Sequence, residues 1–297
     1  MKTTPFILAA LMMAAPLCVN SCSVVNQVRS VDMSKIPGLN AVADAQKDMM
    51  AQYGTSARLL LQSRMAALEA LALDAEAYAD AKKAGEAYDK AVTIAKNARA
   101  KMAAVNEELT NIQNSPDLGA LNKAVDNTKD AEDMVNKGYT ELASIAGNAN
   151  AAITAQNNKG DKLNLAAVQH VEAANVKIAE SYGLLQDARW EEAKLVGVAA
   201  VQSAALVKSM KDASPMDKAA LAITFRPIVY FVTGLPGEFE EQGAIMDMWE
   251  EHAKQVAGLK LPSRKQLPDV KAVAAKAAPQ LASTFTPSVG SFFNFNN

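Results

Sequence analysis

The stretch from residue 55 to residue 113 constrains the fold most strongly, because it contains no proline and only one glycine, Gly85. Apolar and small residues recur there at steps of three and four between Leu71 and Ile112. This spacing is typical of the seam of a coiled-coil-like helix. We therefore predict a single helix across the stretch, about 85 Å long at a rise of 1.5 Å per residue. A helix of that length favours an elongated bundle over an ordinary globular fold.

Two further places carry the signals of a helix start. At Ser115-Pro116-Asp117 and again at Ser214-Pro215, a serine that can cap a helix precedes a proline suited to the first helical turn. The segment QNNKGDK at 156–162 has the composition of a turn. These signals predict a second helix that ends near residue 146 and a third from about 164 to 211. Because the breaks are short, neighbouring helices should be antiparallel.

The C-terminal part of the chain is less regular. Arg226-Pro227 interrupts an apolar run at 219–235, and a proline inside a helix costs about 3 kcal/mol. Beyond Gly258 the chain is basic and punctuated by prolines, and its end is rich in phenylalanine. This tail is expected either to wrap its own bundle or to bind a partner or an anionic envelope surface.

The beginning of the chain has the pattern of an export signal. Lys2 precedes an apolar run, residues 6–17, that is too short to span a bilayer. The next residues, Val19-Asn20-Ser21-Cys22, resemble the bacterial lipobox, with an aliphatic residue three positions before the cysteine and a small residue directly before it. The resemblance implies that Val19 and Ser21 serve signal recognition and that cleavage precedes a lipidated Cys22. An ordinary secretory signal is the alternative.

Lipidation would make the chain the precursor of a bacterial lipoprotein. Members of this class carry several acyl chains, palmitate among them, and more than one chain gives stable anchoring. Ser23 follows the cysteine, which resembles the sorting signal for the outer rather than the inner membrane. Cys18, the only other cysteine, would leave with the leader. The mature chain would then form neither a disulfide nor a cysteine-ligated metal site.

These patterns predict an all-α protein, an elongated antiparallel bundle of long coiled-coil-like helices with a smaller C-terminal helical region. We place the signal peptide at 1–21 and a tether at 22–40. The long-helix bundle follows at 41–258. Residues 259–297 form the basic, proline-punctuated tail with a short helix.

Charge and motifs argue against several kinds of function. The formal net charge is −2, and Lys2 is the only charge in the leader, so neither the precursor nor the mature chain favours nucleic acid. A helical di-metal site would need Glu three residues before each histidine, whereas Ala167 precedes His170 and Trp249 precedes His252. We therefore expect both histidines on solvated helix faces, and no metal, cofactor or catalytic residue.

The expected function follows from long smooth helices without a catalytic motif. We predict a lipid-anchored, non-enzymatic interaction or structural module of the cell envelope, with an envelope protein as partner and possible self-association. The alternative is a hydrophobic-ligand carrier or membrane-active protein that uses the apolar region 195–235. A hydrolase with an unrecognised site is a third reading.

Overall fold

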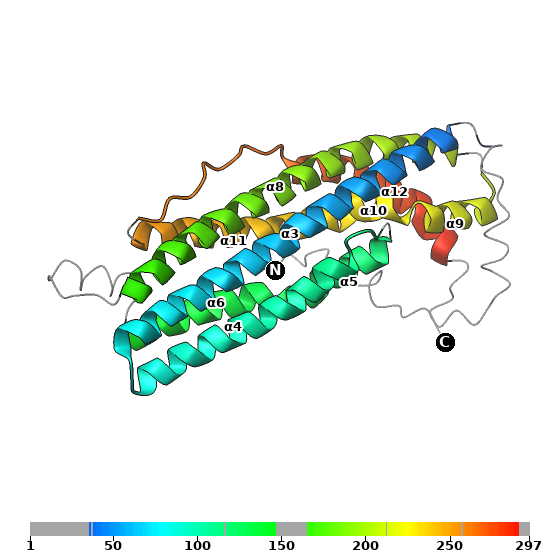
Figure 1. The fold of residues 1–297 in the computed structure, drawn as a ribbon. Helices are drawn as coiled ribbons and strands as arrows, with labels where there is room; N and C mark the ends of the chain where they lie inside the picture. Colours follow the sequence, from blue (N-terminus) through cyan, green and yellow to red (C-terminus); the bar gives the residue numbers. More distant parts are fainter. Residues whose placement is uncertain are drawn as a thin grey trace, which may run out of the picture. The chain divides into compact units, whose positions relative to one another are not determined.

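The computed structural model describes residues 36–290 except 37, 116, 147–164, 212 and 257. Its regular structure is entirely helical, and none of the described residues lies in a strand, which confirms the predicted all-α class. Figure 1 shows the helices. They are α3 (Leu39–Lys82), α4 (Glu86–Asn111), α5 (Leu118–Asn127), α6 (Asp130–Ala146), α8 (Leu165–Ser209), α9 (Pro215–Thr224), α10 (Arg226–Thr233), α11 (Leu235–Gln255) and α12 (Val270–Gly290).

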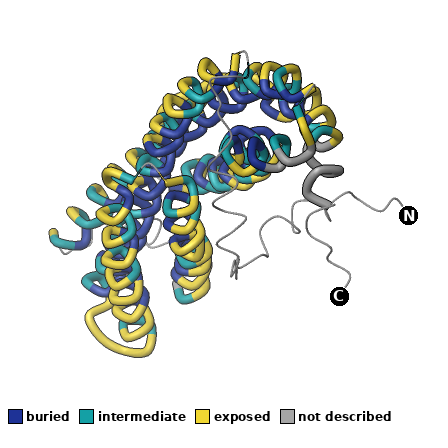
Figure 2. Tube along the Cα trace, turned by 90° about the vertical axis from the view of Figure 1, so that its right-hand side faces the viewer, coloured by how far each residue is buried: buried dark blue, intermediate teal, exposed yellow. Residues whose placement is uncertain are grey.

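The contacts divide the chain into two compact units. Unit 1 comprises the described residues up to Gln52, the stretch Glu192–Phe239 and the described residues from Leu267 onward. Unit 2 comprises Tyr53–Glu191 and Glu240–Gln266. Along the helices, buried positions line one side and exposed positions the other, as Figure 2 shows. This is the division expected of amphipathic helices that share a core.

The single helix predicted over 55–113 is wrong, because the chain turns at Lys83–Gly85. Lys83 has a φ of 63° and Gly85 a φ of 99°, a left-handed region in which glycine is favoured. The chain reverses there into a helical hairpin. Arg99 of α4 consequently returns to Glu76 of α3, where its Nε and Nη2 donate to the two carboxylate oxygens at 2.7 and 2.8 Å.

The second predicted helix is two helices. Asp117, not Ser115, is the N-cap of α5, since its Oδ1 accepts a hydrogen bond from the Gly119 N–H at 2.8 Å. The chain then breaks at Thr128, whose hydroxyl donates to the Ala124 carbonyl at 2.9 Å, before α6 begins at Asp130. Its end at Ala146 agrees with the prediction.

In unit 2, α3 and α8 are antiparallel, as predicted for the long helices. Serine hydroxyls of α3 donate to carbonyls of α8, from Ser56 to Ala188 at 3.3 Å and from Ser63 to Ser181 at 2.8 Å. Rising numbers on α3 therefore meet falling numbers on α8. Small residues at these contacts let two helix backbones approach closely. The predicted bounds of 164–211 for this helix are close to those of α8.

Helix α6 runs parallel to α3 in the same unit. The Arg64 Nε donates to Glu132 at 2.8 Å, and the Tyr139 hydroxyl donates to Asp74 at 2.9 Å. Helix α11 in turn runs parallel to α6. Lys129, directly before α6, pairs with Glu241, and further along the ring of Tyr139 contacts Trp249. Side chains far apart in the sequence, Asp74 of α3, Tyr139 of α6 and Trp249 of α11, therefore lie next to one another in unit 2.

Unit 1 contains the C-terminal part of α8 together with α9, α10 and α12. The predicted start at Ser214-Pro215 is confirmed, since Ser214 Oγ accepts from the Asp217 N–H at 3.1 Å. The interruption at Arg226-Pro227 is also confirmed, because α10 begins there. Phe225, Phe231 and Ile228 are fully buried, and α12 packs against α9 and α10. The tail helix α12 has 21 residues and is longer than predicted.

The segment after α11 is extended and lies along α8 in unit 2. We call residues 259–266 the strap. The Lys265 N–H donates to the buried Gln186 Oε1 at 2.6 Å, and its ammonium pairs with Asp187. Arg264 pairs with Asp247 and Glu250 of α11. Ionic and polar contacts, more than apolar burial, hold this segment.

Candidate functional site

The residues predicted for signal recognition and lipidation, Val19, Ser21 and Cys22, lie outside the described residues, as do most of the tether and the phenylalanine-rich end. The candidate site of the described structure is therefore a different one. It is a polar layer inside unit 2, which we call the Asp74 layer and which consists of Asp74, Tyr139, Trp249 and His252.

Asp74 lies on the buried face of α3 and is only 1% exposed. Its position three residues after Leu71 and four before Tyr78 places it on the apolar seam. The Tyr139 hydroxyl donates to its Oδ2 at 2.9 Å, whereas its buried Oδ1 has no hydrogen-bond partner among the described residues. A buried polar atom without a partner carries a desolvation cost, so this position is not explained by stability.

Close helix packing brings Tyr139 to Asp74. The neighbouring Gly138 faces Leu71, and a Cβ at that glycine would lie 2.5 Å from a Leu71 methyl carbon. A side chain at this position would force the Leu71 side chain to shift, so glycine favours the close approach of α6 to α3. The glycine therefore sets the helix separation at which the Tyr139 hydroxyl reaches the carboxyl group.

On its other side, Tyr139 contacts two aromatic rings of α11. The ring centroids of Tyr139 and His252 are 4.6 Å apart, and those of Tyr139 and Trp249 are 5.7 Å apart in an edge arrangement. Trp249 and His252 are 5.9 Å apart, also edge to face. The buried Nε2 of His252 has no hydrogen-bond partner among the described residues. The three rings thus connect the carboxyl group to a second unpaired polar atom.

Burial shifts both titratable groups at the ends of the layer toward their neutral forms. Desolvation raises the pKa of Asp74 from 3.8 to about 7, and the Tyr139 hydrogen bond only partly opposes this rise. Desolvation lowers the pKa of His252 from 6.5 to about 4. Burial, and secondarily the charge of Asp74, holds the pKa of Tyr139 well above its usual range. Near pH 6 the layer is therefore an uncharged acid, phenol and imidazole.

The predicted place of His252 on a solvated face is consequently wrong. The signal that sequence reasoning missed is that Trp249, one turn earlier, directs this side of α11 inward. Asp74 was missed as well, although a carboxylate at a seam position is visible in the sequence.

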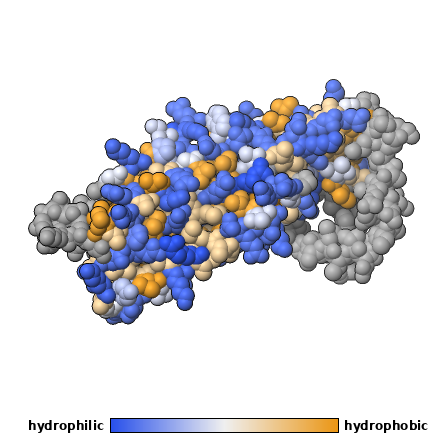
Figure 3. All heavy atoms as spheres, viewed as in Figure 1, coloured by the Kyte–Doolittle hydropathy of each residue, from blue (hydrophilic) through white to orange (hydrophobic). Residues whose placement is uncertain are grey.

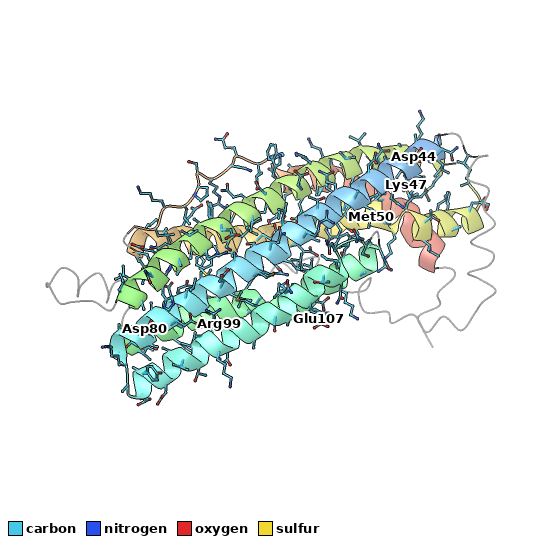
Figure 4. The ribbon with its side chains drawn as sticks, in the orientation of Figure 1. Asp44, Lys47, Met50, Asp80, Arg99 and Glu107 are labelled. Atoms are coloured by element: carbon cyan, nitrogen blue, oxygen red, sulfur yellow. The ribbon has the colours of Figure 1, made fainter. Side chains whose placement is uncertain are left out.

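His170 lies in a separate, half-exposed cluster. Its Nδ1 is 3.2 Å from Asp80 Oδ2, without hydrogen-bond geometry, and its Nε2 is 4.0 Å from Glu76. Glu76 is already held by Arg99 of α4, which Figure 4 labels beside the end of α3 that carries Asp80. In the part of the chain that the structure describes, no group of His, Cys, Asp and Glu is arranged to hold a metal ion.

The surface offers one ordered feature. In unit 2, the exposed apolar side chains of α8 are Leu165 (69% exposed), Val176 (65%) and Trp190 (37%). At 100° per residue these three positions lie within about 40° of one another on the helix. In unit 1, the same helix exposes Val198 and Val201, one turn apart. The face in Figure 3 is otherwise largely hydrophilic, with hydrophobic side chains in separate spots.

Comparisons with known proteins add no relative to these observations, because no family model, curated protein or solved structure matches the chain. Among the described helices, none has a stretch that is long and apolar enough to cross a membrane.

Proposed function

We propose that the protein is a lipid-anchored lipoprotein of the bacterial cell envelope that acts as a non-enzymatic helical interaction module. Ser23, directly after the lipidated cysteine, supports delivery to the outer membrane rather than the inner one. Support for the anchor comes from the sequence Val19-Asn20-Ser21-Cys22, with Cys22 as the lipidated residue. Intact-mass analysis and membrane fractionation of the native chain and of Cys22→Ala test it. An unacylated, unanchored native protein would overturn the anchor.

The row of exposed apolar residues on α8 is the observation that supports an interaction module. Leu165, Val176 and Trp190 follow one another at steps of 11 and 14 residues, which correspond to three and four helical turns. A row with this spacing fits an amphipathic helix that lies along α8. We therefore propose a helix of an envelope protein as the partner.

Site-specific photo-crosslinking in cells tests this surface. A photoreactive residue at Val176 should crosslink one discrete partner, and the crosslink should disappear when Leu165→Asp is added. The matched control is the same probe at Asn97, an exposed position on α4. Equal crosslinking from both positions, or none from Val176, would overturn the proposed surface.

The carrier alternative is less well supported by the packing of unit 1. Most large side chains of the 195–235 region are buried, and those of Leu195, Leu206, Phe225 and Phe231 have no exposed surface. Extraction of the purified protein with organic solvent, followed by mass spectrometry, would show a bound lipid if this region held one.

A further inference from the structure

The Asp74 layer and a second buried polar cluster both join α3 to α6 in unit 2, and they differ in how completely their polar groups are hydrogen-bonded. Arg64 of α3, which is 5% exposed, faces the start of α6. It donates to Glu132, to the Val125 carbonyl and to the Thr128 hydroxyl. We call this the Arg64 layer. Ten residues further along α3, Asp74 has a single hydrogen bond, from Tyr139.

Beyond the Asp74 layer, little polar contact holds α6 to α3. The one further hydrogen bond between the two helices is a long one, from the Tyr78 hydroxyl to the Ile145 carbonyl at 3.5 Å, in the part of the chain that the structure describes. Apolar burial there comes from Val135 and Leu142, and α4 also packs against α6. The polar attachment of residues 135–146 to α3 therefore rests mainly on the Asp74 layer.

We propose that the Asp74 layer is a proton-operated switch, which holds residues 135–146 of α6 against α3 while Asp74 is neutral and releases them when Asp74 is ionised. An ionised Asp74 would be a buried charge with one donor on Oδ2 and none on Oδ1. Such a charge is costly unless it is paired or reaches water. Movement of the adjacent half-helix would admit water to the carboxylate.

Among the residues that the structure describes, no cation pairs with Asp74, whose one hydrogen bond comes from Tyr139. From α6 the facing group is Tyr139, and from α11 it is His252, which stays neutral because charging it in this site is also unfavourable. Arg99 of α4 is engaged with Glu76, and Lys177 of α8 with Glu69 and Glu180.

The remaining charged groups nearby are also engaged elsewhere. His170 of α8 lies against Asp80, Glu250 of α11 pairs with Arg264, and Lys254 of α11 pairs with Glu251. On α6, Lys137 and Glu141 form their own exposed pair. Relief of the buried charge must therefore come from a change of structure.

Hydrogen exchange of the full-length protein at pH 6 and pH 8, read as protection factors by mass spectrometry, tests the switch. Opening that exposes Asp74 should become about tenfold more frequent over this interval, because the closed state loses its bound proton and the open state has none to lose. The loss of protection should be confined to residues 135–146 and to the facing part of α11. Amides near the Arg64 layer should not change.

The variant Asp74→Asn keeps the shape of the side chain and cannot ionise, so the increase in opening from pH 6 to pH 8 should be absent from it. Asp133→Asn makes the same chemical change at an exposed position of α6 and should behave like the native protein. If Asp74→Asn does not fold, the native pattern decides alone. No pH effect, an equal effect across unit 2, or an unchanged effect in Asp74→Asn would overturn the proposal.

Discussion

The Arg64 layer and the Asp74 layer are both polar contacts buried between α3 and α6, yet only the first is complete. The Arg64 guanidinium donates to a carboxylate, to a hydroxyl and to the Val125 carbonyl, which also accepts from the Thr128 N–H. The Asp74 carboxyl meets one hydroxyl and leaves an oxygen unpaired. The comparison shows that burial alone does not make a polar group structural. A buried polar group with a full set of hydrogen-bond partners stabilises the packing of its helix. With too few partners, the packing comes to depend on the protonation state of the group, as proposed for Asp74.

The largest effect is expected from breaking the complete layer. Arg64→Met keeps much of the side chain's length but leaves the Glu132 carboxylate without its Arg64 partner, so the free energy of unfolding should fall by about 3–5 kcal/mol. Arg99→Met is the matched control, because it breaks an exposed pair and should cost less than about 1 kcal/mol. Urea unfolding followed by circular dichroism measures both. Equal losses would remove the distinction between buried and exposed pairs.

The next largest effect is on the pH dependence of the free energy of unfolding, to which Asp74 and His252 should contribute in opposite directions. The pKa of Asp74 is higher in the folded than in the unfolded chain, so its contribution to stability is present at pH 4 and lost as the pH rises to about 7. The pKa of His252 is lower in the folded chain, so its contribution is present above pH 6.5 and lost as the pH falls toward 4.

Single substitutions should separate these two contributions. In His252→Gln, stability should decrease by about 4 kcal/mol between pH 4 and pH 8, the effect of Asp74 alone. In Asp74→Asn it should instead increase by about 2–3 kcal/mol between pH 4 and pH 7, the effect of His252 alone. Urea unfolding at a series of pH values measures both slopes. Parallel pH profiles for the two variants would contradict the assignment.

A smaller effect is expected from Tyr139→Phe, which keeps the ring contacts and removes the one hydrogen-bond donor to Asp74 among the described residues. Because that hydrogen bond favours the ionised carboxylate, its loss should raise the pKa of Asp74 further. The variant should lose about 1–2 kcal/mol of stability, and more at pH 8 than at pH 5. A loss that does not depend on pH would mean that the hydroxyl does not interact with the carboxylate.

The smallest effect concerns the strap, whose ion pairs are exposed. Arg264→Ala should lower the free energy of unfolding by less than about 1 kcal/mol. It should nevertheless speed cleavage of the strap in limited proteolysis, and 0.5 M salt should do the same to the native protein. Resistance of the strap to protease in high salt would show that the Gln186 hydrogen bond suffices to hold it.

Much of the fold could be predicted because helix signals are local. Ser214 and Pro215 mark a helix start whatever packs on it, and Pro227 interrupts a helix by its own geometry. The turn at Gly85 was missed because a single glycine is also tolerated inside a helix, and only the packing of α4 back onto α3 decides between the two.

The candidate site was harder to predict, for a related reason. That Asp74 occupies a seam position is evident in the sequence, but its partners lie 65 residues away on α6 and still further on α11. Neither the single hydrogen bond nor the unpaired Nε2 of His252 has a local signature. The proposed lipidation site at Cys22 differs in this respect, since the lipobox that residues 19–22 resemble is a short linear motif.

The order of the two units along the chain has a consequence for how the protein is made. The last segment of unit 2 ends at Gln266, before α12 begins at Val270. Unit 1 needs that final helix and also joins Gln46 to the Thr224 carbonyl across 178 residues. A growing chain therefore contains every residue of unit 2 while unit 1 still lacks a helix. Since closing long loops slows folding, completion of unit 1 should be the late step in maturation.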